Sequence, residues 1–178
     1  CHDPYTGFSA YHDPKKIGCV SCHLGDPKTE EKELSHKGMV IIPGNLSDAQ
    51  RTCGKCHVNE LRKVRHSLMT SNSGLVAVDK FVFGEAPDPD GSYHIKDIKH
   101  TAADTHLRNL CGNCHLGSEK SELGPITQLS RGGGCNACHL NYTKEASQDL
   151  ATYLQSGKKT LPKIHPSVDI FVKNEHCY

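Results

Sequence analysis

The stretch that decides the fold runs from Cys111 to His139 and holds one pentapeptide twice, as CGNCH at 111–115 and CNACH at 135–139. Two further copies lie upstream, CVSCH at 19–23 and CGKCH at 53–57. Each copy places two cysteines three positions apart and a histidine directly after the second cysteine. One copy could arise by chance, but four copies in 178 residues indicate four equivalent sites.

A Cys-x-x-Cys-His run is the attachment signature of c-type haem. The two thiols add to the haem vinyl groups as thioethers, and the adjacent histidine becomes the proximal axial ligand of the iron. The sequence therefore predicts at least four covalently attached haems c. Their protein ligands are Cys19, Cys22 and His23; Cys53, Cys56 and His57; Cys111, Cys114 and His115; and Cys135, Cys138 and His139.

Zinc is the main alternative for the same cysteines. Paired Cys-x-x-Cys knuckles are a usual zinc spacing, so the first two motifs, or the last two, could each form a four-thiolate site. Four thiolates already complete a tetrahedral site, and zinc then gives no reason for the histidine after every second cysteine. Disulfides are a further alternative, and haem explains the whole pentapeptide better than either.

Composition agrees with a chain built around cofactors. Only 35% of the residues are hydrophobic and 6% are aromatic, with no Trp, and the mean hydropathy is −0.55. A chain of this length normally buries about two-thirds of its unfolded surface. Porphyrins would supply the missing apolar bulk, so we expect the haem-free chain not to fold. Lys and Arg number 21 against 20 Asp and Glu, and haem propionates would make the loaded protein acidic, which argues against a nucleic-acid partner.

Both ends of the chain carry partial motifs. Cys1 and His2 look like the last two letters of a fifth Cys-x-x-Cys-His, and Cys177 could be the first letter of a sixth. We therefore expect 1–178 to be a piece of a longer chain with five or six haems, with any targeting segment removed or outside this stretch. A Cys1–Cys177 disulfide and a lipid-bearing Cys1 are the alternatives. No run approaches the eighteen or more apolar residues of a membrane span.

The histidines outside the motifs are the candidate distal ligands. Thirteen histidines, less the four of the complete motifs and His2, leave eight. They are His12, His36, His66, His94, His100, His106, His165 and His176. Only Met39 and Met69 could provide thioether ligation, which raises the reduction potential. Most haems are therefore expected to be bis-histidine and low in potential, with His66 the leading distal candidate and His176 the weakest.

The secondary structure is expected to be helical and short. Capping by Ser47 or Asp48 and apolar residues at helical spacing predict a helix over 47–70. At about 100° per residue, the nine positions from His57 to His66 would leave these side chains on opposite faces, able to hold two different haems. Further helices are expected from about Ala102 into the third motif and over 144–156, the latter with Ala146, Leu150 and Leu154 on one face.

Two irregular stretches are also predicted. Residues 72–93 are expected to form a loop with a short apolar segment, and a boundary between two dihaem halves, 1–75 and 92–178, would fall there. The run Gly132-Gly133-Gly134 before Cys135 suits either a backbone that passes close to a porphyrin face or a plain flexible turn.

The chain resembles the bacterial multihaem c-type cytochromes of periplasmic and extracellular electron transfer, and the motifs that carry this resemblance span it from end to end. The resemblance implies a mainly α fold with extensive loops, short helices wrapped around stacked haems, and little or no sheet. It also implies a periplasmic or extracellular location and redox-partner proteins or an extracellular acceptor. The partial motifs at the two ends would allow self-assembly through terminal haems. No Cys-x-x-Cys-Lys motif occurs, which argues against the nitrite reductases that use one.

Two functions follow from these features. A compact chain of this length has a radius of gyration of roughly 16 Å, so four porphyrins would lie close enough for fast electron tunnelling. If every iron has two histidine ligands, the protein is an electron carrier and not an enzyme. The alternative is one haem with an open position that acts on a small nitrogen or sulfur compound while the others feed it. The eight spare histidines favour the carrier.

Overall fold

The computed structural model describes residues 5–110, 112, 117–125, 127, 132–159 and 161–176. Within these ranges the chain is mainly α-helical with long loops, as expected. The elements are α1 Pro14–Ile17, α2 Val20–His23, α3 Lys32–Ser35, η1 Cys53–Lys55, α4 Val58–Arg65, α5 Leu68–Ser71, α6 Ser73–Val82, η2 Ile95–Asp97, α7 Ala102–Leu110, α8 Asn136–His139, β1 Leu140–Asn141, α9 Lys144–Gln155, β2 Ser167–Val168 and η4 Asn174–His176.

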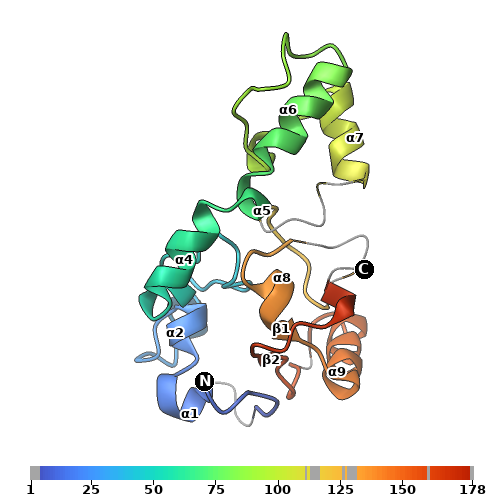
Figure 1. Cartoon of the computed structure of the whole chain (residues 1–178). Helices are drawn as coiled ribbons and strands as arrows, with labels where there is room; N and C mark the ends of the chain where they lie inside the picture. Colours follow the sequence, from blue (N-terminus) through green and yellow to red (C-terminus); the bar gives the residue numbers. More distant parts are fainter. Residues whose placement is uncertain are drawn as a thin grey trace.

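The molecule is elongated, with a body and an arm (Figure 1). The arm consists of α6 and α7, which pack side by side, and it projects from one end of the body. The body carries α1, α2, α4, α8, α9 and the small antiparallel sheet, in which Leu140 pairs with Val168 and Asn141 with Ser167. No helix in the described part of the chain is both long and apolar enough to span a bilayer.

The hydrophobic core cluster of the described residues lies in the arm. Val76 of α6, Ile95 of η2 and Leu107 of α7 are buried together, and Tyr93 and Ile98 pack against them. The helix predicted to start near Ala102 is confirmed as α7, because its apolar face has a partner in α6. Buried hydrophobic residues in the body, such as Leu61 and Leu150, stay outside this cluster.

An ion-pair network holds the far end of the arm together. The Asp104 carboxylate is 2% exposed and lies 2.7 Å from the Lys80 ammonium, which also reaches Glu85 at 3.3 Å. The backbone N–H of Lys99 donates to the same carboxylate at 2.7 Å. Burial opposes the charged form of Asp104, but these hydrogen bonds outweigh it and hold its pKa below the usual value. The network therefore joins α6 to α7 by charge as well as by packing.

The loop predicted over 72–93 is wrong for its first half, because Ser73–Val82 forms α6. Its turn-rich flank, Ala86 to Gly91, is irregular as expected. Val76 and Ala77 are almost fully buried, so tertiary packing stabilises a segment whose local signals were ambiguous. The stretch from Leu75 to Phe83 was too short to distinguish a loop from a helix by its apolar pattern alone.

The single helix predicted over 47–70 is also wrong. Residues 47–52 form turns, and the chain then makes the separate helices η1, α4 and α5. His57 and His66 lie at the two ends of α4 with non-helical backbone angles, so the opposite-face argument does not apply to them. Gly54 interrupts the pattern, because a Cβ there would lie 2.5 Å from the Leu61 side chain and 2.8 Å from the Ala49 carbonyl oxygen.

The helix predicted over 144–156 is confirmed as α9. The Thr143 hydroxyl accepts a hydrogen bond from the backbone N–H of Ala146 at 3.1 Å and caps it. Ala146 and Leu150 face the interior, but Leu154 is 45% exposed, so the apolar face is shorter than predicted.

The glycine run before Cys135 is a buried, closely packed turn. Gly132, Gly133 and Gly134 all have positive φ, and a Cβ on Gly134 would lie 2.2 Å from the Gly44 carbonyl oxygen. Glycine is needed here because both the backbone conformation and the close approach of a second chain segment exclude a side chain.

Candidate functional site

The first motif forms a compact unit around α2. Cys19 immediately precedes the helix, Cys22 lies within it, and His23 is its last residue. The His23 Nδ1 lies 2.7 Å from the carbonyl oxygen of Val40, and the Val40 N–H donates back to the His23 carbonyl at 2.7 Å. This double link fixes the imidazole through Nδ1 and leaves Nε2 as the nitrogen that can bind a metal.

The second motif begins as the 3-10 turn η1. Cys53 is half-buried, Cys56 and His57 are exposed, and His57 directly precedes α4. The Thr52 hydroxyl donates to the Pro43 carbonyl at 2.6 Å, and the Cys53 thiol approaches the same oxygen at 3.9 Å. The motif is thereby attached to the segment 40–44, which also holds the first motif.

The fourth motif repeats the geometry of the first. Cys135 precedes α8 and His139 ends it. The His139 Nδ1 lies 2.8 Å from the carbonyl oxygen of Asp169, again leaving Nε2 for a metal. The Asp169 carboxylate accepts hydrogen bonds from Asn141, Ser167 and the Phe171 backbone, so the turn that presents this carbonyl is itself held in place.

Six predicted ligands fall outside the described residues. They are Cys111, Cys114 and His115 of the third motif, and the partial-motif residues Cys1, His2 and Cys177. The approach to the third motif is described, because α7 ends at Leu110, the residue before it.

The segment 40–44 joins the three described motifs. Val40 hydrogen-bonds to His23, the Pro43 carbonyl meets the second motif, and the Gly44 carbonyl accepts the Cys135 N–H at 2.9 Å. Three residues of this five-residue segment therefore contact motifs that are far apart in the sequence. This backbone bridge brings the three motifs into one part of the body.

Their thiols lie close together as a result. The side chains of Cys53 and Cys135 hydrogen-bond to each other, which lowers the pKa of Cys53 and raises that of Cys135. Burial raises the pKa of the Cys22 thiol, and the neighbouring thiols of Cys53 and of Cys19 raise it further. The cysteines of the first, second and fourth motifs are therefore neighbours, and so would be any groups attached to them.

Two candidate distal histidines lie against motif histidines. The ring centres of His12 and His57 are 6.1 Å apart, with 36° between their planes. Those of His23 and His165 are 5.9 Å apart, with 75° between their planes. Burial lowers the pKa of His165, the charge of His23 adds to this, and the hydrogen bond to the Pro166 carbonyl opposes it.

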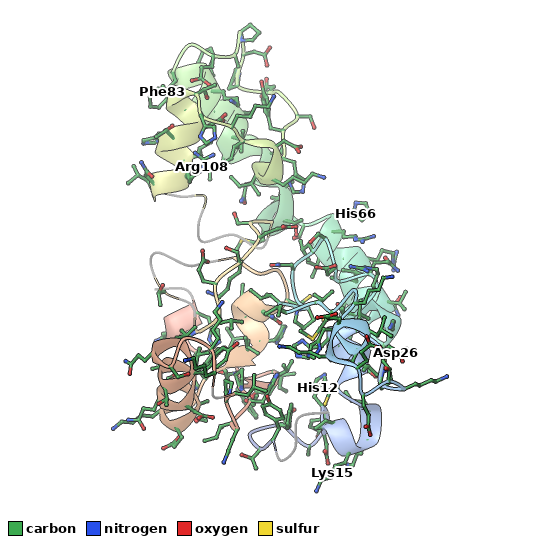
Figure 2. The ribbon with its side chains drawn as sticks, turned by 180° about the vertical axis from the view of Figure 1, so that it is seen from behind. His12, Lys15, Asp26, His66, Phe83 and Arg108 are labelled. Atoms are coloured by element: carbon green, nitrogen blue, oxygen red, sulfur yellow. The ribbon has the colours of Figure 1, made fainter. Side chains whose placement is uncertain are left out.

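The other candidates are dispersed. His66 projects outward from the end of α4, whereas His12 lies on the inner side of the body (Figure 2). His36 places its Nδ1 2.6 Å from the Lys32 carbonyl, and the His106 Nδ1 lies 2.9 Å from the Asp79 carboxylate in the arm. His100 is exposed. The ring contacts between histidines in the described ranges thus involve neither the leading candidate, His66, nor His100.

The described residues do not form a zinc site. No three or more His, Cys, Asp or Glu side chains among them gather in a group that could hold a metal ion. The four thiols of the first two motifs are all described and form no disulfide, and none of them belongs to such a group.

The same residues fit a c-type haem. Two cysteines and a histidine with its Nδ1 hydrogen-bonded recur in the first and fourth motifs. The body also leaves large apolar side chains exposed, which a porphyrin could cover. Examples are Tyr11 at 88%, Val58 at 60%, Leu68 at 80% and Phe171 at 71%.

The groups that orient the histidines were missed by sequence reasoning. Val40 and Asp169 act through backbone carbonyls, which leave no signature in the side-chain sequence. Phe8 stacks on His165 with ring centres 4.6 Å apart, and Asp79 meets His106 from another helix. Of these groups, only the Asp79 carboxylate carries a sequence signal, because it is an acidic residue within an apolar stretch.

No protein-family model matches this chain, and neither a curated protein nor a solved structure matches it at a significant level.

Proposed function

We propose that this chain is an electron-transfer module that holds haem c at its four Cys-x-x-Cys-His motifs. The supporting observation is the anchoring of His23 and His139 through Nδ1 to backbone carbonyls, each at the end of a short helix that also carries a motif cysteine. That hydrogen bond sets the tautomer with Nε2 unprotonated, which is the form that binds iron.

When bound, haem supplies reversible one-electron exchange between ferric and ferrous iron. The residues of this chain fix its position and surroundings. The motif cysteines would tether the haem, the motif histidines would ligate its iron, and the backbone bridge 40–44 fixes the described motifs relative to one another. Because the Val40 and Asp169 carbonyls already hold His23 and His139, these side chains would need little rearrangement during electron exchange.

The adjacency of the motifs supports transfer between haems. The Cys53 and Cys135 thiols interact closely enough to shift each other's pKa, so groups tethered to the second and fourth motifs would have neighbouring edges. Cys22 of the first motif lies near the same place. An electron entering at one of these three motifs would therefore reach the other two. The expected partners are redox proteins or an extracellular acceptor, in a periplasmic or extracellular setting.

The proposal is tested on the chain matured with haem in a periplasmic expression host. Reductive titration followed in the Soret and α bands should take up one electron per attached haem, and the ferrous protein should bind no carbon monoxide. If the protein takes up fewer electrons than it has haems, the haems do not all exchange electrons, which would contradict an electron carrier. Stoichiometric carbon monoxide binding to one haem would instead favour the catalytic alternative.

A further inference from the structure

Building on the proposed function, we infer that the two ends of the chain supply the sixth ligands of the first two haems. His12 completes the site of the second motif opposite His57, and His165 completes the site of the first motif opposite His23. Each distal ligand thus comes from a segment remote from the histidine it faces.

The ring separations carry this assignment. A metal–imidazole bond is about 2 Å long, and the ring centre lies roughly 1 Å behind the bonding nitrogen, so two imidazoles on opposite sides of one iron have centres about 6 Å apart. The observed separations are 6.1 Å for His12 and His57 and 5.9 Å for His23 and His165.

Hydrogen bonding at Nδ1 supports the same pairs. The His12 Nδ1 lies 3.1 Å from the Val168 carbonyl oxygen, and the His165 Nδ1 lies 2.6 Å from that of Pro166. The proton therefore sits on Nδ1 in both rings, and Nε2 keeps the lone pair that iron needs. His23 is held in the same way by Val40.

The two terminal segments hold each other in position. The Thr6 N–H donates to the Lys163 carbonyl at 3.0 Å, and the His165 N–H donates to the Thr6 carbonyl at 2.8 Å. Ser9 donates to the Val168 carbonyl at 2.7 Å, the same oxygen that anchors His12. Residues 5–12 and 163–168, the terminal clasp, therefore form one structural unit that delivers both distal ligands.

The same criterion excludes two other histidines. The His94 Nδ1 accepts the N–H of Lys96 at 3.1 Å, so the proton of the neutral ring lies on Nε2 and blocks it as a ligand. The His176 Nδ1 accepts the N–H of Lys173 at 3.0 Å, and its Nε2 lies 3.2 Å from the Leu140 carbonyl oxygen. Both rings are used structurally, which makes them matched controls.

The test compares His12→Gly and His165→Gly with His94→Gly and His176→Gly in the ferric, haem-loaded chain. Electron paramagnetic resonance and the near-infrared charge-transfer band report spin state independently of any activity. Each distal variant should convert one haem of the four to high spin, so a quarter of the low-spin signal should be lost. Added imidazole should restore the low-spin signal. The two control variants should stay fully low-spin.

The pairing is resolved with a second pair of variants, His12→Met and His165→Met. Each should keep its haem low-spin but raise one reduction potential in a redox titration, because thioether ligation raises potential. In a Cys53→Ala/Cys56→Ala background, which removes the second haem, His12→Gly should add no further high-spin signal, whereas His165→Gly still should.

The outcomes separate this inference from the proposed function. The ligand assignment is overturned if the haem-loaded protein stays low-spin after His12→Gly or His165→Gly. It is also overturned if His94→Gly or His176→Gly changes the spin state. Either result leaves haem binding itself intact. A chain that takes up no haem under maturation overturns the proposed function itself.

Discussion

The imidazole of His23 lies 5.9 Å, centre to centre, from that of His165. The Phe8 ring stacks on His165, with ring centres 4.6 Å apart. One residue near the start of the chain therefore positions a histidine near its end against the first motif. Because the stack is nearly parallel, at 20°, it restricts the rotation of His165 about its side chain.

Replacing Phe8 with Ala should release His165 without removing a ligand. The lost aromatic contact should cost about 1 kcal/mol of folding free energy. We expect the first haem to become partly high-spin and to take up added imidazole, as measured by Soret titration. Val82→Ala is the control, since that side chain is 71% exposed, lies in the arm at the end of α6, and should leave the spectrum unchanged. Equal responses in both variants would contradict the positioning role.

Gly134→Ala should loosen the contact between the fourth motif and the segment 40–44. A Cβ there would lie 2.2 Å from the Gly44 carbonyl, in addition to the strain of φ +56°. The strain alone should cost about 1 kcal/mol, and the backbone clash should add at least as much. Gly157→Ala is the matched control, with φ +68° and open space around its Cβ position. Equal loss of thermal stability in the two variants would show that the close approach contributes nothing.

Lys80→Met should destabilise the arm more than any surface lysine. It leaves the Asp104 carboxylate, 2% exposed, without its cation, and removal of one partner of a buried pair costs about 3 kcal/mol. Lys99→Ala is the control, because only the backbone N–H of Lys99 contacts Asp104. Hydrogen exchange of α6 and α7 amides should report the difference, and equal protection in the two variants would contradict it.

The arm should also lose stability in acid. The pKa of Asp104 is lower in the folded arm than its unfolded value of about 3.9, so its contribution is complete above that pH. The contribution falls as the pH drops from there through the folded pKa. The difference in arm stability between the native chain and Asp104→Asn should therefore shrink below pH 4. A difference that stayed constant down to pH 2 would show that the carboxylate charge is not what stabilises the arm.

The parts of this molecule that follow from local chemistry could be predicted from the sequence. The four motifs and the helices α7 and α9 follow from spacing and caps, whereas the small extent of the sheet was implied by the family resemblance. The long helix predicted over 47–70 is wrong because the chain packs tightly at Gly54, against Leu61, and because the motif turn ends at His57. Neither feature can be recognised from the local sequence.

The candidate ligands could be listed from the sequence, but which histidines face one another could not. Counting the histidines outside the motifs placed His12 and His165 among eight candidates, of which His66 ranked first. Their selection depends on the carbonyls of Val168 and Pro166 and on contacts between the two ends of the chain. Backbone carbonyls carry no residue-specific signal, and contacts of such long range are determined by the whole fold.

The measurement that tests the central claim most directly is the covalent haem content of the purified chain. Intact mass under denaturing conditions, together with the pyridine haemochrome spectrum after acid–acetone extraction, gives the number of haems bound through thioethers. The account predicts that the polypeptide retains at least four, one at each complete motif. A colourless chain of 19.5 kDa that carries zinc or only disulfides would contradict it.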